Sequence, residues 1–162
     1  MQSYNLQSGE WELFPGPAGA ELDHMQALVF ENEIWWLGGR GTQTSREVRI
    51  WNPVSREWRQ GPSMQFARSG FAARVVQGQI MVTGGERLDA VPFQLVPSME
   101  LFAPGAAGWV PGPQPPLAVH GTTGASASGE FFLIGGSTVA GTTSPNRATQ
   151  VYTPDLVAQG DQ

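Results

Sequence analysis

The sequence contains no cysteine and no lysine, and it has no long stretch in which apolar residues recur at helical spacing. Without cysteine the chain can form no disulfide and no thiolate metal site. No segment approaches the roughly 20 consecutive apolar residues that span a bilayer. Residues 1–25 lack the basic stretch followed by an apolar run that marks a secretory signal. We therefore expect a soluble, cytoplasmic protein with no membrane partner.

Positive charge is also scarce. The 162 residues carry 14 acidic and nine basic side chains, and every basic residue is arginine, so the formal net charge is −5. The arginines are scattered along the chain, whereas binding to a phosphate backbone needs clustered positive charge. No carboxylates or histidines stand at a spacing typical of a metal site. These features predict no nucleic-acid partner, no metal and no cofactor.

Glycine and proline are abundant, with 21 and 13 residues. The apolar runs are short and are bounded by Gly, Pro, Asn and Ser, which is typical of short strands joined by turns. The sequence thus predicts an all-β chain, which we treat as a single domain over residues 1–162.

One pattern repeats about every fifty residues, a period typical of propellers and solenoids. Each copy has a glycine doublet, then an aromatic residue, and in two copies a tryptophan seven residues after the aromatic. The doublets are Gly38-Gly39, Gly84-Gly85 and Gly135-Gly136, and the aromatics are Trp51, Phe102 and Tyr152. Trp58 and Trp109 follow the first two aromatics, and the N-terminus repeats this half of the pattern with Tyr4 and Trp11.

The strands follow from the pattern. Two strands are expected within residues 1–15, around a turn at residues 7–9. The later copies predict strands at residues 27–30, 34–37, 48–52 and 58–60, then 71–76, 79–83, 99–103 and 109–110, then 123–128, 130–134 and 149–153. Asn32, Gly78 and Gly129 stand in equivalent turns, where a positive φ is needed.

The doublet, the aromatic and the tryptophan after six intervening residues resemble the kelch repeat, and the resemblance covers nearly the whole chain. It includes the segment from Met64 to Arg68 that leads into the second copy. The resemblance implies four-stranded blades around a central channel, with the tryptophans packed between blades. There are departures: His24 and His120 stand where we align Arg68, and Gln159 replaces the tryptophan of the last copy.

We expect about three four-stranded antiparallel blades, in a partial or half propeller. Residues 1–15 would supply the third and fourth strands of one blade, residues 24–62 and 68–113 two full blades, and residues 120–155 a blade without its fourth strand. Two interpretations stay open. Two copies could form a six-bladed ring, in which the Trp11 strand of one completes the Tyr152 blade of the other, or the chain is a piece of a longer propeller.

The long second-to-third strand loops and the links between blades should share one face, where a rigid scaffold presents binding residues. The candidate binding residues are Arg40, Arg46, Arg68, Glu86, Arg87, Asp89 and Arg147. The resemblance implies a scaffold that binds another protein or peptide, with no catalytic residue expected. The alternative is an enzyme like the kelch-type sialic-acid mutarotases, in which Arg40, Glu86 and Arg87 would act on a sugar acid. A fragment without a function of its own is the third reading, and the absence of cysteine excludes a copper enzyme like galactose oxidase.

Overall fold

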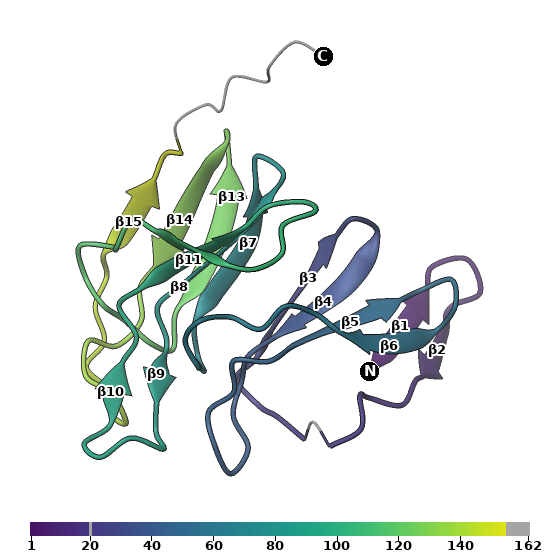
Figure 1. Cartoon of the computed structure of the whole chain (residues 1–162), viewed down its shortest axis with the longest axis horizontal. Coiled ribbons are helices and arrows are strands. Elements are labelled where there is room, and N and C mark those ends of the chain that lie inside the picture. Colours follow the sequence, from purple (N-terminus) through teal and green to yellow (C-terminus); the bar gives the residue numbers. More distant parts are fainter. Residues whose placement is uncertain (20, 155–162) are drawn as a thin grey trace.

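The computed structural model describes residues 1–19 and 21–154, which form β-strands joined by turns and loops (Figure 1). Within these residues there is no helix that could cross a membrane. The prediction of an all-β chain is confirmed.

Two antiparallel sheets have four strands each, and both follow chain order from the inside outward. We call the first sheet blade 1; it contains β3 (Gln26–Phe30), β4 (Glu33–Leu37), β5 (Val48–Asn52) and β6 (Glu57–Gln60). Blade 2 contains β7 (Ala72–Val76), β8 (Gln79–Thr83), β11 (Met99–Phe102) and β12 (Val110–Gly112). These are the four-stranded blades that the repeat predicts.

Blade 3 has three strands within the described residues: β13 (Thr123–Ala127), β14 (Glu130–Ile134) and β15 (Thr149–Tyr152). Its expected fourth-strand position, Gln159, lies outside the described residues. At the other end, β1 (Gln2–Asn5) and β2 (Glu10–Leu13) form a separate hairpin. Tyr4 pairs with Trp11 there as Trp51 pairs with Trp58 in blade 1, so the hairpin has the register of a third and a fourth strand.

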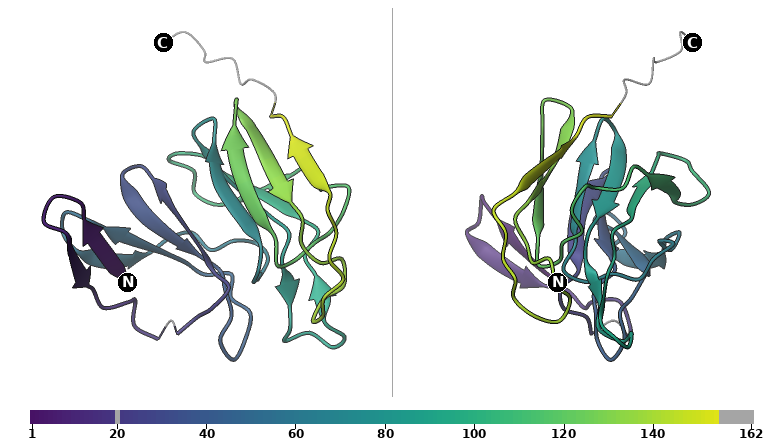
Figure 2. Two further views of the ribbon diagram at one scale, coloured as in Figure 1. Left: turned by 180° about the vertical axis from the view of Figure 1, so that it is seen from behind. Right: turned by 90° about the vertical axis from the view of Figure 1, so that its left-hand side faces the viewer.

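The blades fan out side by side, with β3, β7 and β13 as neighbouring innermost strands (Figure 2). Between blades 1 and 2 lies a mainly aromatic and aliphatic core that includes Phe30, Trp35, Phe71, Phe102 and Trp109. Between blades 2 and 3 lies a second core that includes Val76, Met81, Met99, Phe131 and Leu133. The apolar residues of each blade are therefore buried against the next blade, as expected of units too thin to bury a core alone.

The glycine doublets allow the link that precedes each blade to pass close to the backbone. Gly85 has a φ of +100°, and a Cβ there would lie 2.9 Å from the carbonyl oxygen of Ser69. Gly39 and Gly136 have the same conformation and face Asp23 and His120 in the same way. A side chain at these positions would push the link away from the blade.

The turns between the two inner strands of each blade also agree with prediction. Asn32, Gly78 and Gly129 have φ values of +61°, +75° and +78°. The residue before each of them has a positive φ as well, which defines the type I′ turn favoured by two-residue hairpins.

The three tryptophans of the repeat differ in burial. Trp109 is buried and donates from Nε1 to the carbonyl oxygen of Pro62 at 2.7 Å, and Trp58 donates in the same way to Pro15 at 3.1 Å. Trp11 is 69% exposed, so the expectation that it packs between blades is wrong. Its ring lies against Tyr4, as the ring of Trp109 lies against Phe102.

Candidate functional site

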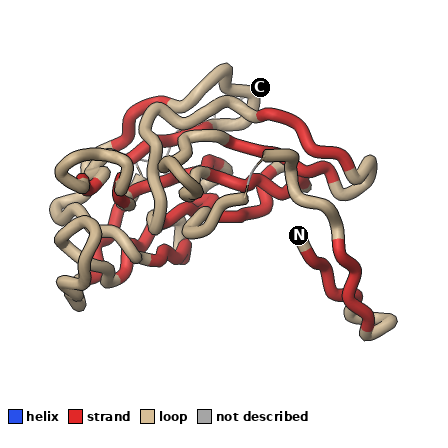
Figure 3. Tube along the Cα trace, turned by 90° about the horizontal axis from the view of Figure 1, so that it is seen from below, coloured by secondary structure: helices blue, strands red, loops and turns tan. Residues whose placement is uncertain are grey.

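The loops after the second strand of each blade and the links between blades lie on one face, below the blades in Figure 1. The short turns within the β3–β4 and β7–β8 hairpins lie at the opposite end of the strands. We call the first surface the loop face; it comprises residues 38–47, 84–98 and 135–148 with the adjoining links, and Figure 3 views the molecule from this side. In its middle loop, β9 (Glu86–Arg87) and β10 (Gln94–Leu95) form a short hairpin that the sequence did not predict.

One carboxylate on this face connects all three blades. Glu86 is buried, and its Oε1 lies 3.5 Å from Nη1 of Arg40 and 3.2 Å from Nδ1 of His120. Its Oε2 accepts a hydrogen bond from the backbone N–H of Gly141 at 2.7 Å. Arg40 belongs to the loop of blade 1 and Gly141 to the loop of blade 3, so Glu86 holds both neighbouring loops in place.

His120 holds the third loop from the other side of its ring. Nε2 lies 2.9 Å from the carbonyl oxygen of Val139 and 3.2 Å from that of Thr142. Carbonyl oxygens can only accept, so Nε2 carries a proton and donates to this turn. The imidazole thus ties the loop of blade 3 to Glu86.

Arg40 extends the row to the first link. Its Nε donates to Oδ1 of Asp23 at 3.0 Å, and Nδ1 of His24 lies 2.9 Å from the same oxygen. The hydrogen bond with His24 is the largest influence on the pKa of Asp23, and together with Arg40 it lowers that pKa despite the opposing effect of desolvation. We call Asp23, Arg40, Glu86 and His120 the inner polar row.

The alignment of the two histidines with Arg68 is wrong. Bridges between link and loop pair Asp23 with Arg40, Ser69 with Glu86, and His120 with Ser137, so His120 is equivalent to Ser69. His24 is one position further along, equivalent to Gly70 and Gly121, and all three have a positive φ, +51°, +62° and +57°. Asp23, Ser69 and His120 each stand 15 residues before the first glycine of their doublet, so the spacing to the doublets gives the correct alignment.

Arg68 is fully buried and presents no surface to a ligand. Its guanidinium donates to Glu100 at 2.7 Å, to Ser98 and to the carbonyl oxygen of Gly84. Burial lowers the pKa of Arg68, and the charge of Glu100 opposes that change. The prediction that Arg68 binds a ligand is therefore wrong. Arg68 instead holds the link against blade 2.

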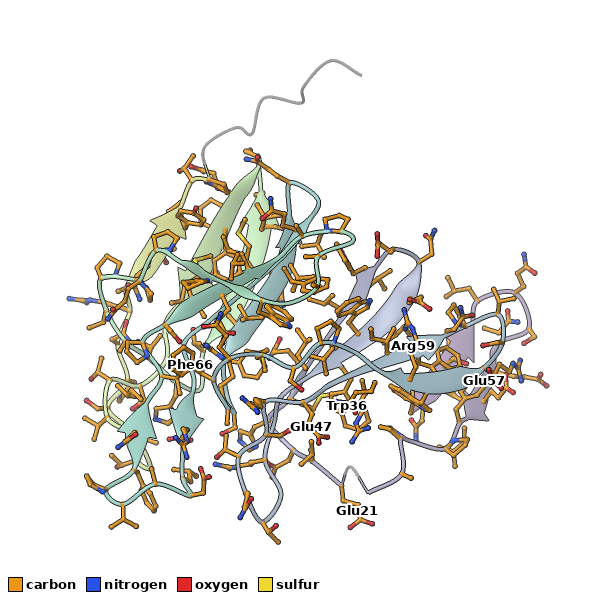
Figure 4. All side chains as sticks on the ribbon, in the orientation of Figure 1. Glu21, Trp36, Glu47, Glu57, Arg59 and Phe66 are labelled. Atoms are coloured by element: carbon orange, nitrogen blue, oxygen red, sulfur yellow. The ribbon has the colours of Figure 1, made fainter. Side chains whose placement is uncertain are left out.

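The other candidates lie on the loop face. Arg87 pairs with Asp89 at 3.4 Å. Burial raises the pKa of Asp89, but the nearby polar side chains of Thr44 and Arg87 outweigh it and the net shift is downward. Arg46 borders a polar hollow between the first link and the loop of blade 1, and Arg147 is exposed in the loop before β15. Glu21 and Glu47, labelled in Figure 4, line the same hollow.

Three exposed apolar side chains on this face were missed from sequence. Val91 is 96% exposed, Phe93 53% and Val139 48%. The ring of Phe93 lies directly over Gly141, so the loops of blades 2 and 3 meet there. The blade 2 loop contains further apolar residues, such as Leu88 and Leu95, so composition alone did not distinguish the exposed ones.

No metal site accompanies the row. Among residues 1–19 and 21–154, no group of three or more histidine, aspartate or glutamate side chains is arranged to hold an ion. Both carboxylate oxygens of Glu86 instead have partners within the protein.

Comparison with known proteins agrees with this architecture. A family model of the Kelch motif matches residues 24–65, which cover the whole of blade 1. Kelch-like protein 33 of Homo sapiens is 25% identical over 96% of this chain and 29% of its own length. An F-box/kelch-repeat protein of Arabidopsis thaliana is 32% identical over 49% of this chain and 20% of its own.

The solved structure of YjhT superposes with a TM-score of 0.73 at 16% identity, covering 90% of this chain and 57% of that one. The fold and its repeated glycine doublets define a kelch-type β-propeller array. A Kelch motif is present at residues 24–65, and the chain is similar to kelch-repeat proteins over nearly its whole length. It spans less than a third of the length of each of the two curated relatives named above.

Proposed function

We propose that this chain is a binding module that holds another protein or a peptide on its loop face, without catalysis. The observation that carries the proposal is the exposed apolar group of Val91, Phe93 and Val139 on loops that the inner polar row fixes in place. The ring of Phe93 lies over Gly141 of the blade 3 loop, so the exposed apolar residues of the two loops are presented where these loops meet. Exposed apolar surface gathered in one place marks an interaction site more often than scattered apolar residues do.

The surroundings of this apolar group suit a partner with mixed chemistry. Arg87 and Asp89 stand on the same loop as Val91, and Arg147 is exposed on the loop that carries Val139. An apolar anchor with polar groups at its rim is the usual anatomy of a protein interface. Arg46, at the polar hollow of blade 1, would lie further out on the same face.

The inner polar row supports a structural role rather than a catalytic one. Both oxygens of Glu86 already have partners, and the guanidinium of Arg40 is shared between Asp23 and Glu86. A sugar-acid enzyme would need such groups free to contact its substrate. We therefore propose no second function.

The test is a binding comparison between matched variants. The immobilised chain should retain a partner from a lysate of its source cells, and Val91→Ser combined with Phe93→Ser should abolish that retention. Val54→Ser is the control, because Val54 is 92% exposed but lies in the β5–β6 turn at the opposite end of the strands. Equal retention by all three proteins would contradict the proposal.

A further inference from the structure

The outer edge of blade 3 contains a groove that the loop-face proposal does not use. The groove is lined by segments of blades 2 and 3 and by the link between them: Thr83, Met99, Pro113, Gln114, Pro115, Pro116, Phe131, Leu133, Gln150, Val151 and Tyr152. Its walls are mainly apolar. Within the described residues β15 pairs only with β14, and the groove lies beside its second edge.

The equivalent site between blades 1 and 2 is occupied, and its occupant indicates which side chain the groove can hold. There the tryptophan of the fourth strand, Trp109, packs on Phe102 with ring centroids 5.3 Å apart. Its Nε1 donates to the carbonyl oxygen of Pro62 in the preceding link. In blade 3 the equivalents of Phe102 and Pro62 are Tyr152 and Pro113, and both line the groove.

Hydrogen bonds within the protein fix one wall of the groove in the absence of a bound strand. The side-chain amide of Gln150 accepts from the backbone N–H of Leu117 at 2.7 Å and donates to the Leu117 carbonyl at 2.9 Å. Glu100 holds the preceding link in the same manner in blade 2, through the backbone N–H groups of Gln65 and Phe66. The wall that carries Pro113 is thus fixed before any strand arrives.

The chain supplies no tryptophan of its own in phase with this groove. Seven residues after Tyr152 the sequence has Gln159, where the two preceding copies have Trp58 and Trp109. The exposed Trp11 is a poor substitute, because β2 is already paired with β1 along four residues and would have to leave it.

We propose that the groove binds an extended segment of a different protein that carries a tryptophan and adds to the second edge of β15 as the fourth strand of blade 3. Backbone hydrogen bonds to the edge strand would supply affinity, and the indole in the groove would supply specificity, as in other cases of strand addition. The groove measures about 80 Å³ and is partly open to solvent, so we expect the added strand to cover the indole on the side that the groove leaves exposed.

The test uses a fluorescently labelled synthetic peptide, PVSREWRQGP, which copies residues 53–62 with their fourth-strand tryptophan. Polarisation against the full chain should detect binding, and the same peptide with alanine in place of tryptophan should bind at least about tenfold more weakly. Amide hydrogen exchange at residues 149–152 should slow in the complex, which simple adhesion to the surface would not cause.

A matched pair of protein variants localises the site. Tyr152→Ala removes the ring that lines the groove and should weaken peptide binding about tenfold. Val151→Ala should not, because Val151 pairs with Phe132 and its side chain points to the opposite face of β15 from Tyr152. The proposal is overturned if the tryptophan and alanine peptides bind equally to the unaltered chain, if neither binds at about 1 mM, or if exchange at β15 does not change.

Discussion

The guanidinium of Arg68 and the carboxylate of Glu100 form an ion pair, with 2.7 Å between Nη2 and Oε1, from which solvent is excluded. Arg68 comes from the link before blade 2 and Glu100 from β11, and the two backbone N–H groups of Gln65 and Phe66 complete the coordination of the carboxylate. The pair fixes the path of the link between blades 1 and 2.

Arg68→Ala should lower the free energy of unfolding by about 3–5 kcal/mol, because it leaves a buried carboxylate without its counter-charge. Arg59→Ala is the matched control: Arg59 also pairs with a glutamate, Glu33 at 2.6 Å, but is 53% exposed, and its loss should cost about 0.2–1 kcal/mol. Urea unfolding of both variants measures the difference. Similar losses would show that the buried pair does not fix the link.

Trp109→Ala should destabilise the chain by about 3–5 kcal/mol, because it opens a cavity in the core between blades 1 and 2. Trp11→Ala should change the stability by no more than about 0.5 kcal/mol, since Trp11 is exposed. Thermal unfolding followed by circular dichroism distinguishes the two. A large effect at Trp11 would mean that the hairpin is covered in solution.

Gly85→Ala should cost more than about 2 kcal/mol, because the new Cβ combines a left-handed backbone conformation with a contact of 2.9 Å to the Ser69 carbonyl. Gly108→Ala should be nearly neutral, because Gly108 has no positive φ and no atom within 4 Å of an added Cβ. Chemical denaturation of the two variants is the measurement. If Gly85→Ala did not change the free energy of unfolding, that result would contradict the close approach of the link to Gly85.

The inner polar row predicts a pH dependence at Asp23. Its pKa is held below the ordinary 3.8, first by the hydrogen bond with His24 and then by Arg40, so its contribution to stability is complete above pH 3.8. That contribution is lost as the pH falls through the lowered value. NMR titration of the Asp23 carboxyl should therefore give a higher midpoint in His24→Gly, a change that suits the φ of +51°. An unchanged midpoint would contradict the assigned cause.

The assembly state is testable by light scattering. We expect a monomer of 17.4 kDa, because β2 is engaged with β1 and is not available to β15 of a second copy. A dimer that disappears in Trp11→Ala would support the six-bladed ring instead.

The repeat pattern located almost every strand, because glycine doublets, turn residues and aromatics each occupy positions with a defined backbone or packing requirement. Val48–Asn52, Gln79–Thr83 and Glu130–Ile134 match their predicted bounds. The short β9–β10 hairpin was missed because each of its strands has only two residues. The loop around it shows no alternation of apolar and polar residues that would indicate a strand.

The site was less accessible from sequence. Arg40 and Glu86 were selected from their places after glycine doublets, and they do meet. The role of His120 was not foreseen, because its partner Glu86 comes from the loop of another blade and is distant in sequence. The burial of Arg68 was not foreseen either, since its partner Glu100 lies 32 positions away on a strand.

The hydrogen bonds from Trp58 to Pro15 and from Trp109 to Pro62 point backward along the chain. During synthesis on the ribosome, the acceptor therefore exists before its donor emerges, and each nascent unit meets a finished surface on its predecessor. Blades can therefore be added one after another from the N-terminal end. An additional blade inserted between two others should fit if it has its own fourth-strand tryptophan and a proline in the link that follows it.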